Sequence, residues 1–459
     1  MKPASRMPGV AILLAAASAF APRAAAAREV WATADGASTL ELRGFYKALG
    51  NGLKMSQGLV EGTQALAELL PEARALPAYG CTTSHVTRAW ARYLLGERLD
   101  LQVGWQLAAT AATDPAFTSS AALGGGVPVD GARGASRRLV DFEPVLADHR
   151  GVLVSHNLDL LAVKAHASFA DVTLGRQVLS WGSGRLWNPT DLLSPFAPTD
   201  IDREARRGVD ALRVSIPLAS TAQLELLWLP QKEARDQGGV IRGQVNLAGF
   251  DIAPSAAKYV RDLVFGFDTS GDLGPLGVHA ELAWTRALDR DELGRRDEFL
   301  RGVVGLDARP AEALVLTAEY YFNGWGARDP SGYLDVLRSD RVGRGEVFGA
   351  GRHYLGLAAN HQVSELLTVQ AVALTNLTDP SAMLVPALEY WAAQSVLVRF
   401  GGFLPLGRAP DSSGLRRLKP QDAALQTDVF LQAAGSLGLR SEYGASPYGL
   451  FAQIGLYLL

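Results

Sequence analysis

The sequence predicts an all-β protein, a transmembrane antiparallel β-barrel of about sixteen strands, give or take two. Segments of about ten residues alternate apolar and polar side chains, which is the period of a strand with one wet face. The links between these segments alternate between short and long. Beyond the first twenty-odd residues, no run of eighteen apolar residues without a charge occurs, so membrane-spanning helices are not expected.

The N-terminus is typical of a secretory signal peptide over residues 1–27. A positive start at Lys2 and Arg6 precedes a short apolar stretch, and the small residues that precede a cleavage site end at Ala27. We therefore expect cleavage after Ala27. The mature chain, residues 28–459, is expected to form a single barrel domain.

Composition excludes several classes of protein. The formal charge of −3 becomes −6 once the three basic residues of the signal peptide, which contains no acids, are removed. This mild acidity argues against nucleic acid as a partner. The single cysteine, Cys81, cannot form an internal disulfide, so a closed hydrogen-bond network must supply stability instead.

Alternation is clearest in residues 99–107. Leu101 and Val103 share one face with their apolar neighbours, whereas Asp100 and Gln102 share the other. A soluble sandwich would alternate in the same way, so alternation alone does not decide the fold. The predicted strands cover residues 39–49, 84–95, 98–109, 152–167, 170–181, 208–218, 221–230, 259–268, 276–286, 298–308, 313–323, 350–361, 365–376, 381–391, 395–404 and 446–459.

The lengths of the links favour a barrel over a sandwich. Short links such as 96–97 alternate with long ones, and only 377–380 breaks the pattern. Outer-membrane barrels have tight turns on the periplasmic side and extended loops outside. Residues 239–249 could form an additional strand. The long links cover residues 50–83, 110–151, 182–207, 231–258, 287–297, 324–349 and 405–445.

Polar side chains on the wet faces are candidates for the lining of a lumen. About sixteen strands enclose a space too wide for side chains to fill, so water must occupy it unless a loop plugs it. A basic side chain facing lipid at the midplane costs roughly 2–4 kcal/mol, so these charges are expected inside. The alternative is that many of them pair across neighbouring strands and only stiffen the wall. The candidates are Glu41, Arg43, Arg88, Arg92, Glu225, Asp262, His279, Glu281, Glu319 and Arg399.

Residues 174–213 carry the most informative pattern. Alternation breaks at Gly175 and Arg176, which indicates a bulge or an inward arginine. Three prolines together with Asn188 and Asp191 then predict a rigid loop, and charges gather at its far end.

This architecture resembles that of general porins, in which the third outside loop folds into the barrel and narrows it. The resemblance implies such a constriction here. The residues then expected at or near it are Arg176, Arg185, Asp191, Asp202, Arg203, Glu204, Arg206 and Arg207. The alternative is that arginines and carboxylates of the loop pair only to fasten it to the wall. Residues 174–213 also resemble an uncharacterised proteobacterial barrel family, in which a Gly-Arg-Gln strand leads to Trp-Gly and an Asn-Pro-Thr-Asp loop. Some relatives of that family are associated with export of lipids or polysaccharides.

No catalytic or cofactor motif accompanies the barrel pattern. The sequence lacks the phosphate-binding G-x-x-x-x-G-K-[ST] motif and H-E-x-x-H, and its seven histidines show no metal-ligand spacing. Ser183 has no nucleophile elbow around it. We therefore expect no cofactor, no metal and no enzymatic activity. Ser155 and His156 are the only weak candidates for a hydrolase.

Three functions stay open at this point. The leading one is a porin-like channel in the Gram-negative outer membrane, for passive or weakly selective passage of small hydrophilic solutes. The second is an export conduit or assembly partner for a lipid or polysaccharide, which would need a periplasmic partner and a plugged or laterally open lumen. The third is an outer-membrane hydrolase. In every case the barrel would contact outer-membrane lipid, and many barrels of this size are homotrimers.

Overall fold

The computed structural model describes the chain from residue 28 to residue 458 with several gaps. The predicted signal peptide, residues 1–27, lies outside the described residues. The described ranges are 28–35, 37–69, 74–114, 117, 138–149, 151–204, 206–289, 297–413 and 438–458.

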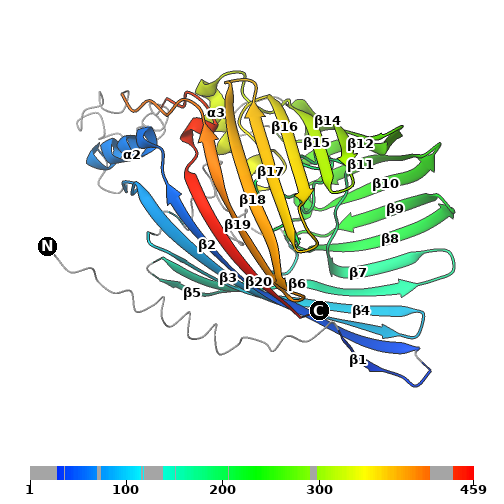
Figure 1. Cartoon of the computed structure of the whole chain (residues 1–459). Helices are drawn as coiled ribbons and strands as arrows, with labels where there is room; N and C mark the ends of the chain where they lie inside the picture. Colours follow the sequence, from blue (N-terminus) through cyan, green and yellow to red (C-terminus); the bar gives the residue numbers. More distant parts are fainter. Residues whose placement is uncertain are drawn as a thin grey trace.

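Eighteen strands form a closed antiparallel ring, and two short strands extend it (Figure 1). The ring strands are β2 (Ser38–Lys54), β3 (Tyr79–Leu95), β4 (Leu99–Ala112), β6 (Val152–His166), β7 (Asp171–Gln177), β8 (Val209–Ala219), β9 (Ala222–Leu229), β10 (Gly238–Leu247), β11 (Phe250–Tyr259), β12 (Asp262–Leu273), β13 (Leu276–Ala287), β14 (Glu298–Ala311), β15 (Leu314–Asn323), β16 (His353–Gln362), β17 (Leu367–Asn376), β18 (Ser381–Ala393), β19 (Val396–Leu406) and β20 (Tyr448–Leu458).

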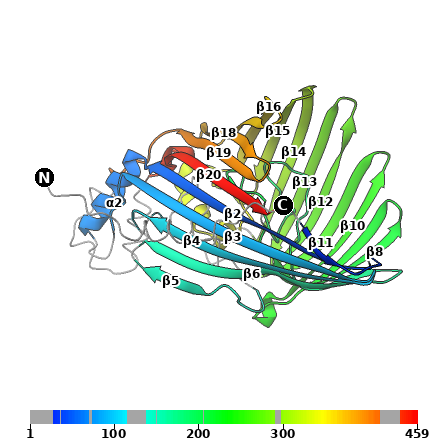
Figure 2. The same cartoon turned by 60° about the horizontal axis from the view of Figure 1, so that its bottom comes forward.

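The ring closes between its first and last strands. β2 and β20 pair over eleven residues, up to Lys54 opposite Tyr448. The two additional strands continue the wall end to end with ring strands: β1 (Arg28–Ala32) pairs with β2 beyond the end of β20, and β5 (Val145–His149) pairs with β6 beyond the end of β7 (Figure 2). Closure removes the sheet edge whose unpaired groups hydrocarbon could not satisfy.

The two faces of the wall differ as the alternation predicts. On β4, Leu101, Val103 and Trp105 are exposed on the outside of the ring, whereas Asp100 and Gln106 are buried on the inside. Exposed apolar side chains recur in this way on strand after strand. Such a face is suited to hydrocarbon, so the structure confirms the predicted barrel class.

The predicted count of sixteen strands is wrong by one hairpin. β10 coincides with residues 239–249, which the sequence allowed as an extra strand, and β11 lies in the predicted long link 231–258. Pro254 lacks an N–H and is followed by serine and alanines, which form strands poorly, so β11 gave no strand signal. The turn between the two strands places Ala248 at φ 53° and Gly249 at φ 85°, the left-handed pair of a tight hairpin.

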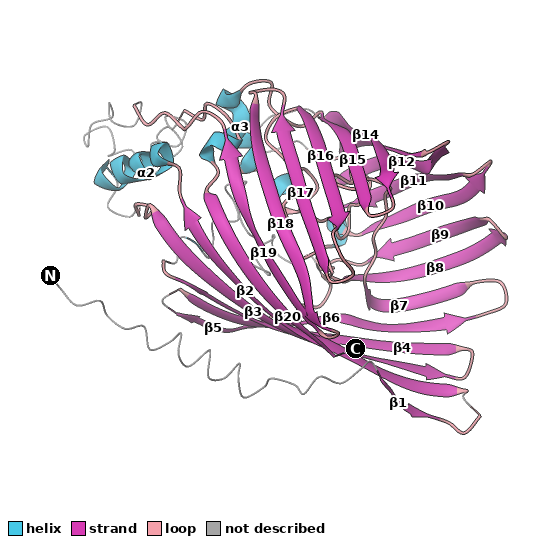
Figure 3. Ribbon diagram, in the orientation of Figure 1, coloured by secondary structure: helices cyan, strands magenta, loops and turns pink. Residues whose placement is uncertain are grey.

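The two ends of the barrel carry different links. Tight turns join the strands at the end where β20 finishes, and the helices lie in links at the opposite end (Figure 3). In outer-membrane barrels the end with long links faces the cell exterior, so we call it the outer end. Within the described ranges, no helix is both long and apolar enough to cross a membrane. The helices are α2 (Gln57–Leu69), α3 (Tyr333–Leu337) and α4 (Asp340–Gly343), with 3-10 turns η3 (Ala234–Asp236), η4 (Pro330–Gly332) and η7 (Tyr443–Ala445).

The additional hairpin can be tested by labelling. In a Cys81→Ser background, Ala248→Cys places a thiol in the tight turn between β10 and β11, and Lys232→Cys places one in the outer link before β10. We expect a membrane-impermeant maleimide added to intact cells to label position 232 and to spare position 248. Labelling of both positions would show that residues 231–258 form one outer link, which contradicts the eighteen-strand ring.

Candidate functional site

The wall is interrupted where β7 ends. After Gln177 the chain leaves the ring, and it rejoins only at β8. Gly175 precedes the departure with φ at 119°, and a Cβ there would lie 2.2 Å from the carbonyl oxygen of Leu161. Only glycine fits this close approach at a positive φ. We call the intervening segment, residues 178–208, the crossing loop.

On one side of the lumen, Glu281 of β13 holds the first part of the crossing loop. Its Oε1 accepts hydrogen bonds from the backbone N–H groups of Ser183 at 2.7 Å and Gly184 at 2.6 Å. Its Oε2 accepts from the N–H and the hydroxyl of Thr190 at 3.0 and 2.8 Å. The buried carboxylate thus satisfies three backbone donors that have left the strand ladder.

Glu319 of β15 binds the next residues of the crossing loop in the same way. Its carboxylate accepts from the N–H groups of Arg185, of Leu186 at 3.0 Å and of Trp187 at 3.2 Å. The Nε2 of His279 lies 2.8 Å from its Oε1. Two wall carboxylates therefore bind consecutive backbone amides, which fixes the path of the loop.

On the other side of the ring, Lys47 of β2 holds the last part of the crossing loop. Its ammonium lies 2.6 Å from Oδ2 of Asp202 and 2.7 Å from Oε2 of Glu204. The hydroxyl of Tyr457 also donates to Glu204 at 2.8 Å, and Arg399 lies 3.5 Å away. Because β2 and β13 are almost opposite in the ring order, the loop spans the lumen.

Apolar packing supports the polar anchors of the crossing loop. The ring of Trp187 stacks on Tyr321 with centroids 5.4 Å apart and lies 6.0 Å from Tyr354. Gly356 leaves room for this contact, because a Cβ there would lie 2.4 Å from a methyl carbon of Leu186. The loop is therefore packed against β15 and β16 as well as bonded to the wall.

Internal bonds make the crossing loop stiff. Nη1 of Arg206 lies 2.5 Å from Oδ2 of Asp191, whose side chain is almost fully buried. Arg203 donates to the carbonyl oxygens of Arg185 at 3.1 Å and Pro198 at 2.7 Å. These contacts join the two limbs of the loop to each other.

The predicted constriction residues divide by what they contact. Arg176 belongs to β7 and is buried in the wall, with its Nε 2.7 Å from Oδ1 of Asp210. The side chain of Arg185 is 57% exposed and lies 3.2 Å from Asp307. The other six predicted residues bind within the crossing loop or bind it to neighbouring segments. Such pairing is what the fastening alternative predicts. That these residues also narrow a pore stays a prediction. These residues are Asp191, Asp202, Arg203, Glu204, Arg206 and Arg207.

The predicted lining residues lie on ring strands, and most of them form an ion pair with a side chain of opposite charge. Glu41 and Arg43, near the inner end, are 3.5 Å apart, and Arg43 stays largely exposed. His279, Glu281 and Glu319 support the crossing loop. Asp262 differs, because it begins β12 and faces the outer mouth. The remaining pairs are Arg88 with Asp159 at 2.5 Å, Arg92 with Asp100 at 2.9 Å, Arg399 with Glu389 at 2.8 Å, and Glu225 with Arg213.

A polar recess lies between the crossing loop and the inner end of the barrel. One cavity of about 390 Å³ separates loop residues 178–182 from β8, β9 and β10. A second cavity of about 420 Å³ shares Arg213 and Gln223 with the first and extends to Lys164. The inner half of the lumen therefore keeps room for water and small solutes beside charged side chains.

Sequence reasoning missed three charged residues of this region. Lys47 follows Arg43 on the inward face of one strand, so strict alternation could have found it. Arg213 is accompanied on its face only by small residues, and it gave no signal. Arg242, which pairs with Asp268 at 3.2 Å, lies in the strand that was not counted.

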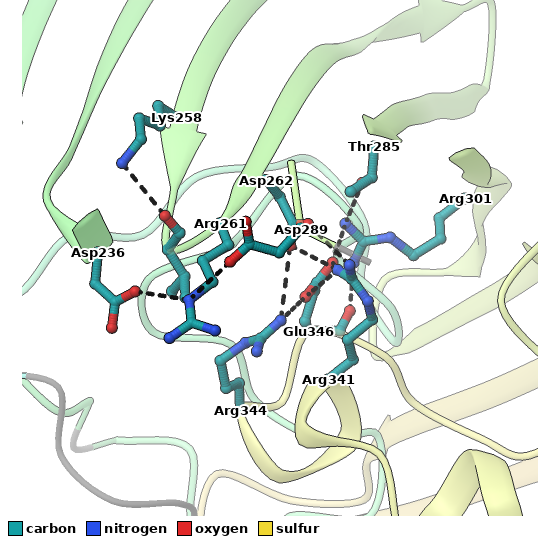
Figure 4. Close-up of polar contacts among 11 residues, drawn as sticks. Asp236, Lys258, Arg261, Asp262, Thr285, Asp289, Arg301, Arg341, Arg344 and Glu346 are labelled. Carbon is teal, nitrogen blue, oxygen red and sulfur yellow. Dashed lines mark hydrogen bonds and ion pairs between the residues drawn. The ribbon is translucent and has the colours of Figure 1, made fainter. Parts of the chain in front are cut away.

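A charge cluster fastens the link 324–352 at the outer mouth (Figure 4). Glu346 lies 2.9 Å from Arg341 and 2.7 Å from Arg344, and Arg341 also pairs with Asp262 at 2.7 Å. Burial alone would raise the pKa of Glu346, but the charges of Arg341, Arg301 and Arg344 outweigh it and lower the pKa to about 2. Glu346 thus stays ionised across the ordinary pH range.

A second buried carboxylate, in the link before β20, joins that link to the link 324–352 and to the outer ends of β16 and β17. Glu442 accepts from the N–H of Ala350 at 3.0 Å, from the hydroxyl of Tyr354 at 2.6 Å and from the amide of Asn376 at 2.6 Å. Burial raises the pKa of Glu442. The outer mouth is therefore built from links that are bonded to one another.

The described residues contain no cluster of three or more histidine, cysteine or acidic side chains that could hold a metal ion. Ser155 and His156 follow each other on β6 and point to opposite faces, so they cannot act as a nucleophile and its base. The geometry offers anchoring carboxylates and a polar recess.

Comparison with known proteins gives the fold class. No family model and no curated protein matches the chain. The structure of Pseudomonas aeruginosa OccK9 (OpdG) matches with a TM-score of 0.51 and 13% identity, over 91% of this chain and 98% of that one. Salmonella typhi OmpF in complex with daunomycin has a TM-score of 0.43 and 10% identity, over 93% of this chain and 100% of that one. The chain has the fold of a porin-like outer-membrane barrel.

Removing one carboxylate should loosen the crossing loop. Glu281→Gln leaves one acceptor oxygen where there were two, so at least one loop N–H loses its partner. We expect a loss of about 1–3 kcal/mol in the free energy of unfolding. The measurement is the temperature at which the folded band on a gel converts to the unfolded one. Glu365→Gln, in an exposed inner turn, is the control, and equal temperatures for both variants would contradict the anchoring role.

Acid should weaken the outer mouth within a defined window. A carboxylate with a lowered pKa stabilises the folded form above its ordinary pKa, and the stabilisation is lost as pH falls from about 4.5 to about 2. We expect the melting temperature of the wild type to fall over this window and that of Glu346→Gln to fall less, from a lower value at pH 7. Glu298→Gln, exposed at the rim, should follow the wild type. Parallel curves for all three proteins would refute the assignment.

Proposed function

We propose that the protein is a porin-like channel of the outer membrane through which small hydrophilic solutes diffuse. The closed ring provides an apolar outside and a polar inside, and the fold is that of porin-like barrels. The expected homotrimer belongs to the same proposal. The barrel class alone does not set the size limit of such a channel.

The observation that carries the proposal is the crossing loop with its anchors on opposite walls. A loop held only at its two ends would move under thermal motion and admit solutes of variable size. Here Glu281 and Glu319 bind its first limb and Lys47 its second. We infer that the fixed loop sets the width of the aperture. The predicted constriction residues would then act by holding the loop in position.

Weak charge selectivity follows from the pairing inside the lumen. Arg213 is matched by Glu225, and Arg242 by Asp268 at 3.2 Å. Fields of paired charges fall off faster than those of single charges, so neither cations nor anions gain a strong preference. Arg185 also has an acidic partner, Asp307 at 3.2 Å, but more than half of its side chain is exposed.

Liposome swelling with sugars of graded size tests the channel directly. We expect entry rates that fall steeply with sugar size, because a fixed aperture excludes by size. Absence of swelling with every sugar would refute the channel. That result would favour the export conduit for a lipid or polysaccharide, which needs a plugged lumen.

The role of the second anchor can be tested in planar bilayers. Lys47→Gln removes the ammonium that holds Asp202 and Glu204, so the second limb of the crossing loop should swing away. We expect larger single-channel conductance, more current noise and entry of larger sugars. Lys232→Gln, on an outer link, is the matched control. Unchanged conductance in Lys47→Gln would show that the loop does not set the aperture.

A further inference from the structure

The two cavities of the polar recess meet on the inward faces of β8 and β9, where Arg213 and Gln223 line both. Their volumes, about 390 and 420 Å³, fall within the roughly 300–1,000 Å³ that is usual for small-molecule sites. β8, β9 and β10 lie side by side in the wall here (Figure 1). The channel proposed above needs only the width of this space, so the chemistry of its lining has no role in that proposal.

Every charged side chain that lines these cavities has a partner of opposite charge within the described chain. The recess therefore offers a charged solute no unpaired charge to bind, and such a solute loses hydration when it enters. The pairs are Arg213 with Glu225, Arg242 with Asp268 at 3.2 Å, Lys164 with Asp171 at 2.8 Å, and Asp100 with Arg92 at 2.9 Å.

Two glutamines supply hydrogen-bonding groups that the wall leaves unused. Gln223 of β9 and Gln244 of β10 lie directly opposite each other in register. Nε2 of Gln223 donates to Glu225 at 3.1 Å, and Oε1 of Gln244 accepts from Arg242 at 3.2 Å. A carboxylate only accepts and a guanidinium only donates, so these partners fix the orientation of both amides. The free ends, Oε1 of Gln223 and Nε2 of Gln244, have no partner among the described residues and are not buried.

Two hydroxyl groups and a strip of backbone extend this uncharged surface. Thr173 of β7 and Ser215 of β8 line the second cavity, and in the described part of the chain neither hydroxyl is hydrogen-bonded or buried. Residues 178–182 of the crossing loop line the first cavity, and none of their backbone N–H or C=O groups bonds to another described residue. Backbone groups of this kind need partners, which water or a solute can supply.

We propose that the recess binds an uncharged polyhydroxyl solute, a small sugar in its ring form. Each hydroxyl of a sugar both donates and accepts, so two adjacent hydroxyls match the free acceptor of Gln223 and the free donor of Gln244. Side chains directly opposite each other on paired strands are close enough to serve neighbouring groups of one ring. The assignment names a solute class for the proposed channel and rests on that function, since a solute reaches the recess through the lumen.

Saturation-transfer difference NMR on the purified protein tests the site at equilibrium and without permeation. The detergent is lauryldimethylamine oxide, which carries no sugar. The probes are glucose, glucuronate and glucosamine, which share one type of ring and differ in charge. We expect glucose to bind saturably in the millimolar range, because only a few neutral hydrogen bonds form, and about threefold more tightly than either charged sugar.

Two matched substitutions remove the free acceptor and the free donor one at a time. Gln223→Leu and Gln244→Leu nearly keep the size of the side chain, and each should weaken glucose binding about threefold to tenfold. Gln370→Leu is the control, because Gln370 shares the inward face of β17 with Leu374, on the far side of the ring from β9. Heat-dependent gel migration shows that each variant is folded.

A third variant tests whether ion pairing disfavours charged sugars. Arg213→Gln leaves Glu225 without its cationic partner, so glucosamine should bind about threefold more tightly to this variant than to the wild type. Glucuronate should gain nothing. This measurement stands by itself if either glutamine variant fails to fold.

Equal binding of the three sugars by the wild type, or glucose binding that neither glutamine substitution weakens, would overturn the site. Unchanged glucosamine binding by Arg213→Gln would overturn the role of the ion pairs. Swelling of liposomes by sugars without saturable binding of glucose would refute the site and leave the channel standing. Saturable binding without any swelling would refute the channel and leave the site standing.

Discussion

Every backbone group at membrane depth must find a hydrogen-bond partner, and this constraint organises the whole molecule. Pairing of β2 with β20 satisfies it for the wall by leaving the ring no edge. The crossing loop leaves the ladder and loses that source of partners. Carboxylates of the wall accept hydrogen bonds from its N–H groups instead. Glu281 and Glu319 therefore supply the hydrogen-bond partners that neighbouring strands supply elsewhere in the ring.

Carboxylates whose oxygens accept hydrogen bonds from backbone N–H groups interact only weakly with a passing solute, because those oxygens are already occupied. The same holds for the arginines of the lumen, because most of them face a carboxylate on a neighbouring strand. Removing single charges from water is costly, and pairing offsets part of that cost while stiffening the wall. A passage built in this way discriminates by its dimensions more than by its charge, which connects the interior chemistry to the proposed diffusion of small hydrophilic solutes.

Most of the wall could be predicted from alternation, and the exceptions have local causes. Sixteen of the ring strands coincide with predicted strands, and on most of them large apolar side chains are exposed on the outward face. β11 gave no such signal, because Pro254 and its small neighbours form part of the wall without large apolar side chains. The acidic anchors could be predicted as inward residues. Their partners could not, since the amides that bind Glu281 belong to a loop about a hundred positions away, and no periodicity shows which wall it reaches.

Arg176 lies where the alternation of β7 breaks, and its contacts tie together segments that are far apart in the sequence. The alternation breaks because Arg176 and Gln177 are both buried, and β7 leaves the ring directly after them, so residues 152–160 of β6 have no partner from β7. Residues 138–149 replace it: the carbonyl oxygens of Pro144 and Phe142 accept from His156 and Leu158 at 3.3 and 3.2 Å. Arg176 joins this patch to the ring, because it donates to carbonyl oxygens on both sides of the seam and binds Asp210. Arg176 therefore ties the wall together at the point where the chain turns inward. Its place at or near a constriction stays a prediction.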